Sequence, residues 1–376
     1  MADNISMEGH LADRMAHITS SGIRRIFELG ARLVDPIDLS IGQAHFDVPE
    51  PIKEAAIEAI RQGRNRYTIT QGIGPLNEGI RRRIERMHGF SPESTLVTSG
   101  VSGALLLGFE CLVNPGDDVL LPDPYFTMYK VLATLCGARL VYYDTYPDFR
   151  LDTAQIAALI TDRTKLILLN SPSNPTGAVY TRAEIENLAA LCRAHDLVVV
   201  SDEIYDQFVY DAPFTSIATF YEKTLLISGF TKSYGMPGWR VGYAAGPAQL
   251  LDKMKTLQQF TYVCAPSMAQ HACLTALDVD VEGHRRDYRE KRDMVVQGLD
   301  PAYQLTPPAG SFYGFPTVPA GYPDDVTFVE RALAENLLIV PGSAFSRRNT
   351  HFRLSFAADN DRLERGIEIL NRLAHP

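Results

Sequence analysis

The middle of the chain alternates short apolar runs with longer stretches of helical periodicity. The runs are rich in Leu and β-branched residues and are apolar on both faces of an extended strand. They cover residues 96–99, 118–121, 140–143, 165–169, 197–200, 224–227 and 240–244. Strands that are apolar on both faces and alternate with helices are typical of a parallel sheet covered by helices on both sides.

The segments between these runs predict amphipathic helices. They cover residues 51–62, 101–113, 125–136, 153–160 and 182–195. In the first of them Pro51 stands at the first turn and Gly63 just past the end, which is the usual asymmetry of a helix. The fold class expected from this pattern is α/β.

A different pattern begins after about Cys273. A charged helix over 284–298 leads into a region rich in Pro and Gly, and residues 351–356 predict a strand. These features predict a second, smaller α+β domain. We therefore expect a large domain over 47–283 and a small domain over 284–376, with an N-terminal segment, 1–46, that contributes to the small domain.

The composition excludes several classes of protein. Among 376 residues, 36 Lys and Arg face 45 Asp and Glu, which gives a net charge of −9. No basic surface for nucleic acid and no polybasic membrane anchor is expected, and no apolar run approaches the ~20 residues of a membrane span. Five cysteines without a Cys-x-x-Cys pair and nine scattered histidines disfavour a disulfide framework and a metal site. We expect a cytoplasmic protein.

Polar residues follow several of the predicted strands at the point where each strand ends. These ends are Ser99–Gly100, Asn170–Asn174, Ser201–Glu203 and Ser228–Lys232. Because ligands bind outside the carboxyl ends of the strands in open parallel sheets, the pattern predicts one shared polar site.

The turn at Gly100, Val101 and Ser102 opens a helix, so its backbone N–H groups suit a phosphate or a carboxylate. The same residues resemble the nucleophile elbow of a serine hydrolase, with Ser102 as nucleophile and a late histidine, His351 or His375, as base. The hydrolase hypothesis leaves Lys232 and Arg240 without a role.

The segment from Ser228 to Tyr243, which contains Lys232 and the run Gly-Trp-Arg240-Val-Gly-Tyr, resembles the lysine motif of class I pyridoxal-phosphate (PLP) aminotransferases. Further motifs of class I and II aminotransferases follow in the family's order between about residues 37 and 357. They are Leu39–Gly42, Tyr67–Gly74, Ser171–Gly177, Asp202–Tyr205, Pro341–Phe345 and Arg353–Ser355. The resemblance implies fold type I, with a large domain of mostly parallel sheet and a smaller α+β domain.

The resemblance also implies roles for the residues that match. Lys232 forms a Schiff base with the PLP aldehyde and later carries a proton. For this its pKa must fall below the usual ~10.4, through desolvation and cations such as Arg240. Asp202 pairs with the protonated pyridine nitrogen, while Asn174 and Tyr205 hold the ring's phenolic oxygen.

The phosphate is expected on the turn Gly100–Ser102, where Ser228 adds a hydroxyl and Arg240 a charged fork. Tyr125 matches the position at which the family stacks an aromatic ring on the cofactor. Tyr67 matches a tyrosine that reaches the phosphate of the neighbouring subunit, which implies a homodimer.

The strand 351–356 admits two interpretations. By alternation alone, Arg353 lies on the solvent-facing side of an edge strand. The resemblance instead implies that Arg353 holds the substrate α-carboxylate bidentately, with help from the Gly42 backbone and Asn174.

These features predict a PLP-dependent aminotransferase that moves an amino group from an L-amino acid to a 2-oxo acid such as 2-oxoglutarate in a ping-pong cycle. Neutral or aromatic donors are favoured, because Ser102 stands where aspartate-preferring relatives often carry Lys. Aspartate remains an alternative if another cation, such as Arg24, Arg25 or Arg347, reaches the pocket.

A PLP-dependent carbon–sulfur β-lyase is a further alternative, since it uses the same Lys, Asp and Arg. A PLP-sensing regulator is disfavoured because the motifs start too early for an appended DNA-binding domain.

Overall fold

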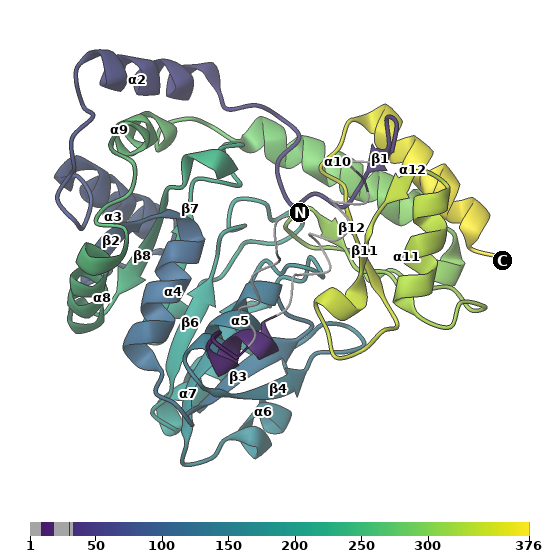
Figure 1. Cartoon of the computed structure of the whole chain (residues 1–376), viewed down its shortest axis with the longest axis horizontal. Helices are drawn as coiled ribbons and strands as arrows, with labels where there is room; N and C mark the ends of the chain where they lie inside the picture. The colour runs from purple at the N-terminus through teal and green to yellow at the C-terminus, as the bar shows by residue number, and fades with distance from the viewer. Residues whose placement is uncertain (1–8, 19–29, 31–32, 376) are drawn as a thin grey trace.

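The larger part of the molecule is built around a central sheet of seven strands, which helices cover (Figure 1). The computed structural model describes residues 9–18, 30 and 33–375. The strand order in this sheet is β2-β8-β7-β6-β5-β3-β4. The bounds are β2 Ser94–Thr98, β3 Asp118–Asp123, β4 Arg139–Asp144, β5 Thr164–Asn170, β6 Val198–Asp202, β7 Thr224–Gly229 and β8 Gly242–Gly246.

Strand β8 departs from the expected parallel arrangement. It runs antiparallel to both β2 and β7, whereas all other pairs in this sheet are parallel. The connection from β7 to β8 contains only the single-turn helix η3, Pro237–Trp239, and no crossover helix that would allow a parallel return. The strand also begins at Gly242 rather than Arg240, because Arg240 adopts a left-handed φ of 56°.

The apolar runs are explained by cover on both faces of the sheet. In β5, Leu166 and Leu168 pack against helices α4, α5 and α8, while Ile167 and Leu169 pack on the opposite side with α6 and α7. On that same side, β7 and β8 pack against α3 and α9, and α2 in turn packs against α9. Each of these four β5 residues is at most 1% exposed, so a continuous apolar run is what a strand in this position requires.

Five of the helices around this sheet lie in the predicted segments, and three more, α3, α8 and α9, were not predicted. Their bounds are α2 Glu50–Arg61, α3 Gly74–His88, α4 Gly100–Leu112, α5 Thr127–Leu135, α6 Thr153–Leu159, α7 Arg182–Ala194, α8 Ala248–Thr261 and α9 Ser267–Ala276. Helix α5 begins two residues later than expected, because the backbone of Phe126 is still extended, with φ −73° and ψ 130°.

The C-terminal part combines helices with two small sheets. Its elements are α10 Glu282–Gly298, β9 Tyr313–Gly314, α11 Asp325–Ala334, β10 Leu337–Leu338, β11 Val340–Pro341, β12 Phe352–Ser355 and α12 Asn360–Leu373. Strand β1, Ile37–Asp38, pairs in parallel with β10. The N-terminal segment therefore joins this part of the fold, while the three domain boundaries stay a prediction.

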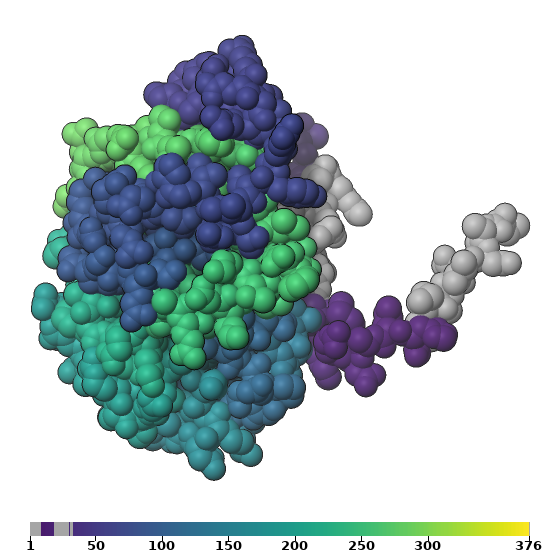
Figure 2. Space-filling view, turned by 90° about the vertical axis from the view of Figure 1, so that its left-hand side faces the viewer, coloured from purple at the N-terminus to yellow at the C-terminus, as the bar shows by residue number. Residues whose placement is uncertain are grey.

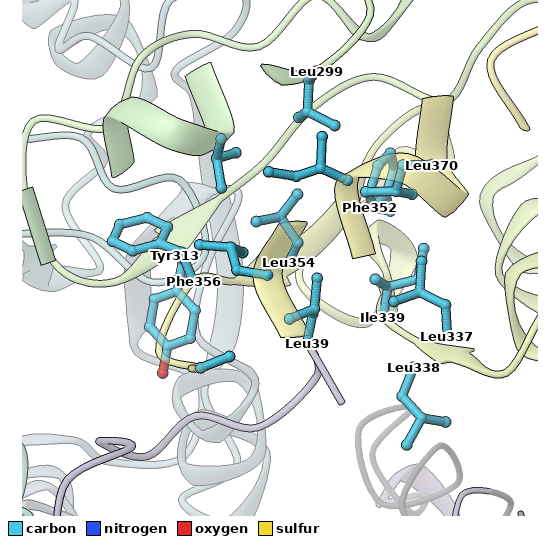
Figure 3. Close-up of a cluster of buried hydrophobic side chains, with 14 of the residues drawn as sticks. Leu39, Leu299, Tyr313, Leu337, Leu338, Ile339, Phe352, Leu354, Phe356 and Leu370 are labelled. Carbon is cyan, nitrogen blue, oxygen red and sulfur yellow. The ribbon is translucent and has the colours of Figure 1, made fainter. Parts of the chain in front are cut away.

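Strand β12 is not an edge strand. It lies between β11 and β9, and its four residues are at most 2% exposed. Leu354 and Phe352 belong to an apolar cluster that also contains Leu39 and residues of β10 and α12 (Figure 3). The alternation in the sequence therefore placed Arg353 on a solvent-facing side that this strand does not have.

The first described segment lies outside the compact body. Figure 2 shows residues 9–17, in purple, extending from the rest of the molecule. They include the short helix η1, Asp13–His17, and the exposed side chains of Leu11 and Met15. Within the described residues, no helix combines the length and apolar character needed to cross a bilayer.

Candidate active site

The polar strand ends meet around one cavity of about 250 Å³. It lies at the carboxyl edge of the large sheet, since β2, β5, β6 and β7 all end at that edge. The lining residues are Gly42, Val101, Ser102, Leu105, Phe126, Tyr129, Asn170, Asn174, Asp202, Ile204, Tyr205, Thr231, Lys232, Pro237, Arg240, Tyr313 and Arg353. The structure thus brings together residues from four strand ends, the N-terminal segment and the C-terminal part.

Lys232 lies in the loop that follows β7, and its amine faces the cavity. The Nζ group donates a short hydrogen bond to the Gly42 carbonyl oxygen. The pKa of Lys232 is lowered to about 8, mainly by burial and also by the cations Arg353 and Arg240, while Asp202 opposes the shift. A substantial fraction of this amine is therefore unprotonated just above neutral pH, as a nucleophile or base requires.

Asp202, the last residue of β6, is 2% exposed. The pKa of this carboxyl is raised to about 6, because burial outweighs two hydrogen bonds and Lys232, which favour the ionised form. The Tyr129 hydroxyl donates to Oδ2 at 2.8 Å, and the Ile204 backbone N–H donates to Oδ1 at 3.2 Å. The site therefore holds an oriented carboxylate that is ionised at neutral pH and able to pair with a protonated ring nitrogen.

Tyr205 and Asn174 also face the cavity. The Tyr205 hydroxyl lies 3.0 Å from that of Tyr313, so one of the two can donate to the other and leave a proton for a ligand. The Asn174 backbone N–H donates to Asn170 Oδ1 at 2.9 Å, which fixes the loop after β5. Both side chains are buried and present polar atoms from neighbouring strand ends.

Arg353 is a buried cation with donors to spare. Its Nη1 donates to Asn174 Oδ1 at 3.0 Å and its Nη2 donates to Ser40 O at 2.7 Å, while Nε is buried without a partner. The guanidinium carbon lies 4.5 Å from the Tyr313 ring centroid and 4.6 Å from that of Phe345. Because a buried charge is costly unless it is paired, this geometry suits an anionic ligand.

A second anion-binding surface lies at the start of α4. Gly100 has a φ of +69°, and a Cβ atom there would come within 2.6 Å of Arg240 Nη2. Glycine therefore allows the guanidinium of Arg240 to lie against the turn. The backbone N–H groups of Val101 and Ser102 begin the helix at the same point, so the helix N-terminus and a cation act together on one ligand group.

Four predicted residues lie outside the cavity lining: Gly100, which directly precedes the lining residues Val101 and Ser102, and Ser228, Tyr125 and Tyr67. Ser228 is fully buried, and its hydroxyl donates to the Glu203 carbonyl oxygen at 3.3 Å. Tyr125 is 5% exposed and packs its ring against Tyr142. Tyr67 is 83% exposed and lies on the surface of this single chain.

Neighbours of two of these residues line the cavity instead. Thr231, next to Lys232, is one of them. Phe126, and not Tyr125, presents an aromatic ring to the cavity. In the connection between β3 and α5, neighbouring side chains point to different sides. Whether Tyr125 or Phe126 faces the cavity therefore depends on the residue at which α5 begins, which is Thr127.

Two further lining residues, Tyr129 and Tyr313, escaped the sequence reasoning. Tyr129 lies in the first turn of α5, three residues after the N-cap residue Phe126, and in the helix predicted over 125–136 this spacing would have placed both on the face toward the cavity. Tyr313 comes from β9, and no local pattern indicates that it meets Tyr205 across 108 positions.

The geometry does not support a serine hydrolase. Ser102 lines the cavity, but neither His351 nor His375 does. His351 stacks on Phe315, and burial lowers its pKa to about 4. His375 lies 3.1 Å from Asp300 near the C-terminus. Neither histidine therefore acts as the base for Ser102 in this arrangement.

A model of the family "aminotransferase class I and II" matches residues 34–370. The chain belongs to this family. The aminotransferase is 37% identical to "putative aminotransferase YugH" of Bacillus subtilis, over 98% of this chain and 99% of that protein. It is 36% identical to "aspartate/prephenate aminotransferase" of Thermus thermophilus, over 93% and 94% of the two chains. It is 32% identical to "aromatic-amino-acid aminotransferase 2" of Thermococcus litoralis, over 96% and 98%.

Solved structures give the same answer for the fold. The aminotransferase superposes on the aspartate aminotransferase of Thermus thermophilus with maleate at a TM-score of 0.93, with 34% identity over 96% of this chain and 99% of that one. The predicted fold, a mostly parallel α/β sheet with a smaller α+β part, is confirmed, as is the prediction of a PLP-dependent transferase.

The residues of the cavity fit the cofactor that this family uses. The lining holds three cations, Lys232, Arg240 and Arg353, and one acid, Asp202. Among the described residues, none of the three cations forms an ion pair within 4.0 Å. These groups suit an anionic ligand that combines a phosphate with an aldehyde, since the helix N-terminus and Arg240 could hold the phosphate and the Lys232 amine could react with the aldehyde.

Proposed function

We propose that this aminotransferase moves the amino group of a neutral or aromatic L-amino acid to a 2-oxo acid such as 2-oxoglutarate in a ping-pong cycle. The observation that carries the proposal is the placement of a buried, unpaired Arg353 and an amine of lowered pKa, Lys232, on one small cavity. The first suits a substrate α-carboxylate, and the second suits proton transfer at the neighbouring carbon.

The polar groups that line the cavity support an assignment for each part of the cofactor. Lys232 would attach to the cofactor aldehyde, Asp202 would pair with the protonated ring nitrogen, and Asn174 and Tyr205 would hold the phenolic oxygen. PLP supplies the electron sink that makes the substrate Cα–H acidic. The Phe126 ring takes the stacking position that the sequence had given to Tyr125.

The phosphate group belongs at the start of α4. Gly100, Val101 and Ser102 would contribute backbone N–H groups, and Arg240 would contribute its guanidinium. The hydroxyl of Thr231 takes the place proposed for Ser228, which is turned toward the Glu203 carbonyl.

The choice of amino donor rests on the charges of the cavity. Lys232, Arg240 and Arg353 are its cations, and each is already required for the cofactor or the α-carboxylate. Arg347 lies over the Tyr142 ring at 5.2 Å and does not line the cavity, while Arg24 and Arg25 are outside the described residues. Among the described residues, a second substrate carboxylate would therefore find no partner in a largely buried site, which costs several kcal/mol.

Aspartate is the second candidate donor. It is favoured by the names of relatives such as the "aspartate aminotransferase" of Pyrococcus abyssi, which is 32% identical over 96% of this chain. Kinetics decide between the two candidates. We expect kcat/KM with 2-oxoglutarate to be higher for phenylalanine, alanine or kynurenine than for aspartate. An advantage of aspartate of about tenfold, or ~1.4 kcal/mol, would refute the charge argument.

The reaction type has its own test. Half-reactions with single amino acids, followed through the absorbance of the bound cofactor, report amino transfer without a second substrate. Release of a thiol from S-substituted cysteines, faster than transfer to 2-oxoglutarate, would support the β-lyase alternative instead.

We also propose a homodimer with the site at its interface. Tyr67, Ile69 and Phe260 are 83%, 57% and 79% exposed, which is unusual for large apolar or aromatic side chains. A second copy of the chain would cover them and bring Tyr67 to the neighbouring phosphate. A chain that sediments as a monomer while fully active would contradict this proposal.

A further inference from the structure

The carboxylate of Asp202 receives one hydrogen bond from a side chain in the described part of the protein, and the donor is Tyr129. The Tyr129 hydroxyl lies 2.8 Å from Oδ2, and the Tyr129 side chain is fully buried. The other carboxylate oxygen accepts the Ile204 backbone N–H at 3.2 Å. Each oxygen of this buried group thus has one donor from a different element.

Helix α5 brings Tyr129 to this position together with the stacking ring. Phe126 and Tyr129 are one turn apart, and both line the cavity. Their rings meet edge to face, with centroids 5.6 Å apart at an interplanar angle of 81°. The first turn of α5 therefore presents an aromatic face to the cavity and a hydroxyl to the carboxylate beneath it.

We propose that Tyr129 is a positioning residue for the cofactor, which acts by fixing the orientation and the ionised state of the Asp202 carboxylate. This inference rests on the proposed function, because it takes Asp202 as the partner of the cofactor's ring nitrogen. Without the hydroxyl, Oδ2 would be a buried acceptor without a donor, and the carboxylate would be free to rotate or to take up a proton.

The charges around Asp202 show why this bond matters. Burial raises the pKa of the carboxyl, and the hydrogen bond from Tyr129 is the largest of the effects that oppose this rise. Lys232, from the loop after β7, favours the ionised form, while Glu203 and Tyr205, from the loop after β6, also face the group. Tyr129 itself stays a neutral donor, because burial and the adjacent carboxylate hold its pKa well above the usual value.

The test compares cofactor affinity in Tyr129→Phe with that in a matched control, Tyr143→Phe. Tyr143 is also fully buried, and its hydroxyl donates at 2.8 Å to the Leu168 carbonyl, but it does not line the cavity. Each enzyme is stripped of cofactor and titrated with PLP at a series of pH values. Both variants remove one buried hydroxyl, so a general packing defect affects them alike.

We expect Tyr129→Phe to bind PLP roughly ten- to hundredfold more weakly at neutral pH. The loss should grow toward acid pH, because the pKa of Asp202 rises when a bond to its ionised form is removed. The midpoint of the pH dependence of affinity should therefore move upward by about one unit. Tyr143→Phe should keep both the affinity and the midpoint of the wild type.

An unchanged midpoint in Tyr129→Phe, or a loss of affinity no larger than in Tyr143→Phe, would overturn the inference. Asp202→Asn separates this failure from that of the proposed function. If Asp202→Asn binds PLP like the wild type, the assignment of Asp202 is wrong; if it binds weakly while Tyr129→Phe is normal, only the role of Tyr129 is wrong. Should Tyr129→Phe be too unstable for titration, the PLP-induced rise in Tm, compared between the same variants, gives the same decision.

Discussion

Replacing Arg353 by lysine should separate the binding of substrate from the binding of cofactor. The guanidinium is 2% exposed, donates to Asn174 Oδ1 and Ser40 O, and lies between the rings of Tyr313 and Phe345. A lysine at this position keeps the charge. It loses the planar fork that holds a carboxylate through two parallel N–H bonds, and it cannot stack between two rings in the same way.

The magnitude follows from the bonds that lysine cannot make. A hydrogen bond to a charged group contributes about 1.5–3 kcal/mol. Lysine would lose one of the two hydrogen bonds to the carboxylate and the strict orientation of the other. We expect this to cost about 3 kcal/mol of transition-state binding, or roughly a hundredfold in kcat/KM. Cofactor affinity should change by less than about threefold, since Arg353 is assigned to the substrate and not to the phosphate or ring.

The assay compares phenylalanine with phenethylamine, which has the same side chain and amine but no α-carboxylate. The wild type should react far better with the amino acid, and in Arg353→Lys this ratio should fall by roughly a hundredfold. Arg362→Lys is the control, because that guanidinium pairs with Asp35 on the surface, away from the cavity. A variant that keeps the wild-type ratio would show that another group binds the carboxylate.

Three further outcomes are expected. Gly42→Ala should lower both Tm and kcat/KM, with a destabilisation of roughly 1–3 kcal/mol, because the new Cβ would lie 2.7 Å from the Tyr313 hydroxyl oxygen. Gly74→Ala is the control: nothing lies within 4 Å of its new Cβ, so neither Tm nor kcat/KM should change. Apoenzyme carrying Lys232→Met should be more stable than the wild type at pH 7 by up to about 3 kcal/mol, since the folded state lowers the Lys232 pKa from 10.5 to about 8. The gain in stability should shrink as pH rises from about 8 and vanish above about 10.5. The measurement is urea unfolding at several pH values, and a free-energy difference between variant and wild type that does not change with pH would contradict the prediction. Finally, the purified enzyme should be yellow, and borohydride reduction followed by peptide mapping should place the cofactor on Lys232; a label on another lysine would refute the assignment.

The sequence predicted the parts of the fold that local pattern controls. The run at residues 165–169 is apolar on both faces because β5 is covered on both sides, so its assignment needed no knowledge of its neighbours. The antiparallel direction of β8 could not be predicted from its own residues. It depends on the absence of a crossover helix after Lys232, in a stretch whose Gly and Pro residues fit several paths.

The same division holds within the candidate site. Lys232 and Asp202 were found because they follow buried strands, and strand ends converge at one edge of a sheet. The alternation in 351–356 misplaced Arg353, because periodicity cannot show that a strand will be covered on both faces by segments far away in the chain. Tyr313 was missed for the same reason, and the exchange of Tyr125 for Phe126 depended on the residue at which α5 begins.

The pairing of β1 with β10 has a consequence for synthesis of the chain on the ribosome. Ile37 emerges early, but its partner, Leu337, is added three hundred positions later. At about 5–20 residues per second, that delay is roughly 15–60 seconds. The seven strands of the large sheet all lie between Ser94 and Gly246, so this sheet has its complete set of strands while the N-terminal segment is still without a partner. Because Ser40 and Gly42 follow β1 closely, the side of the cavity that they form with Arg353 takes shape only when the last part of the chain has left the ribosome.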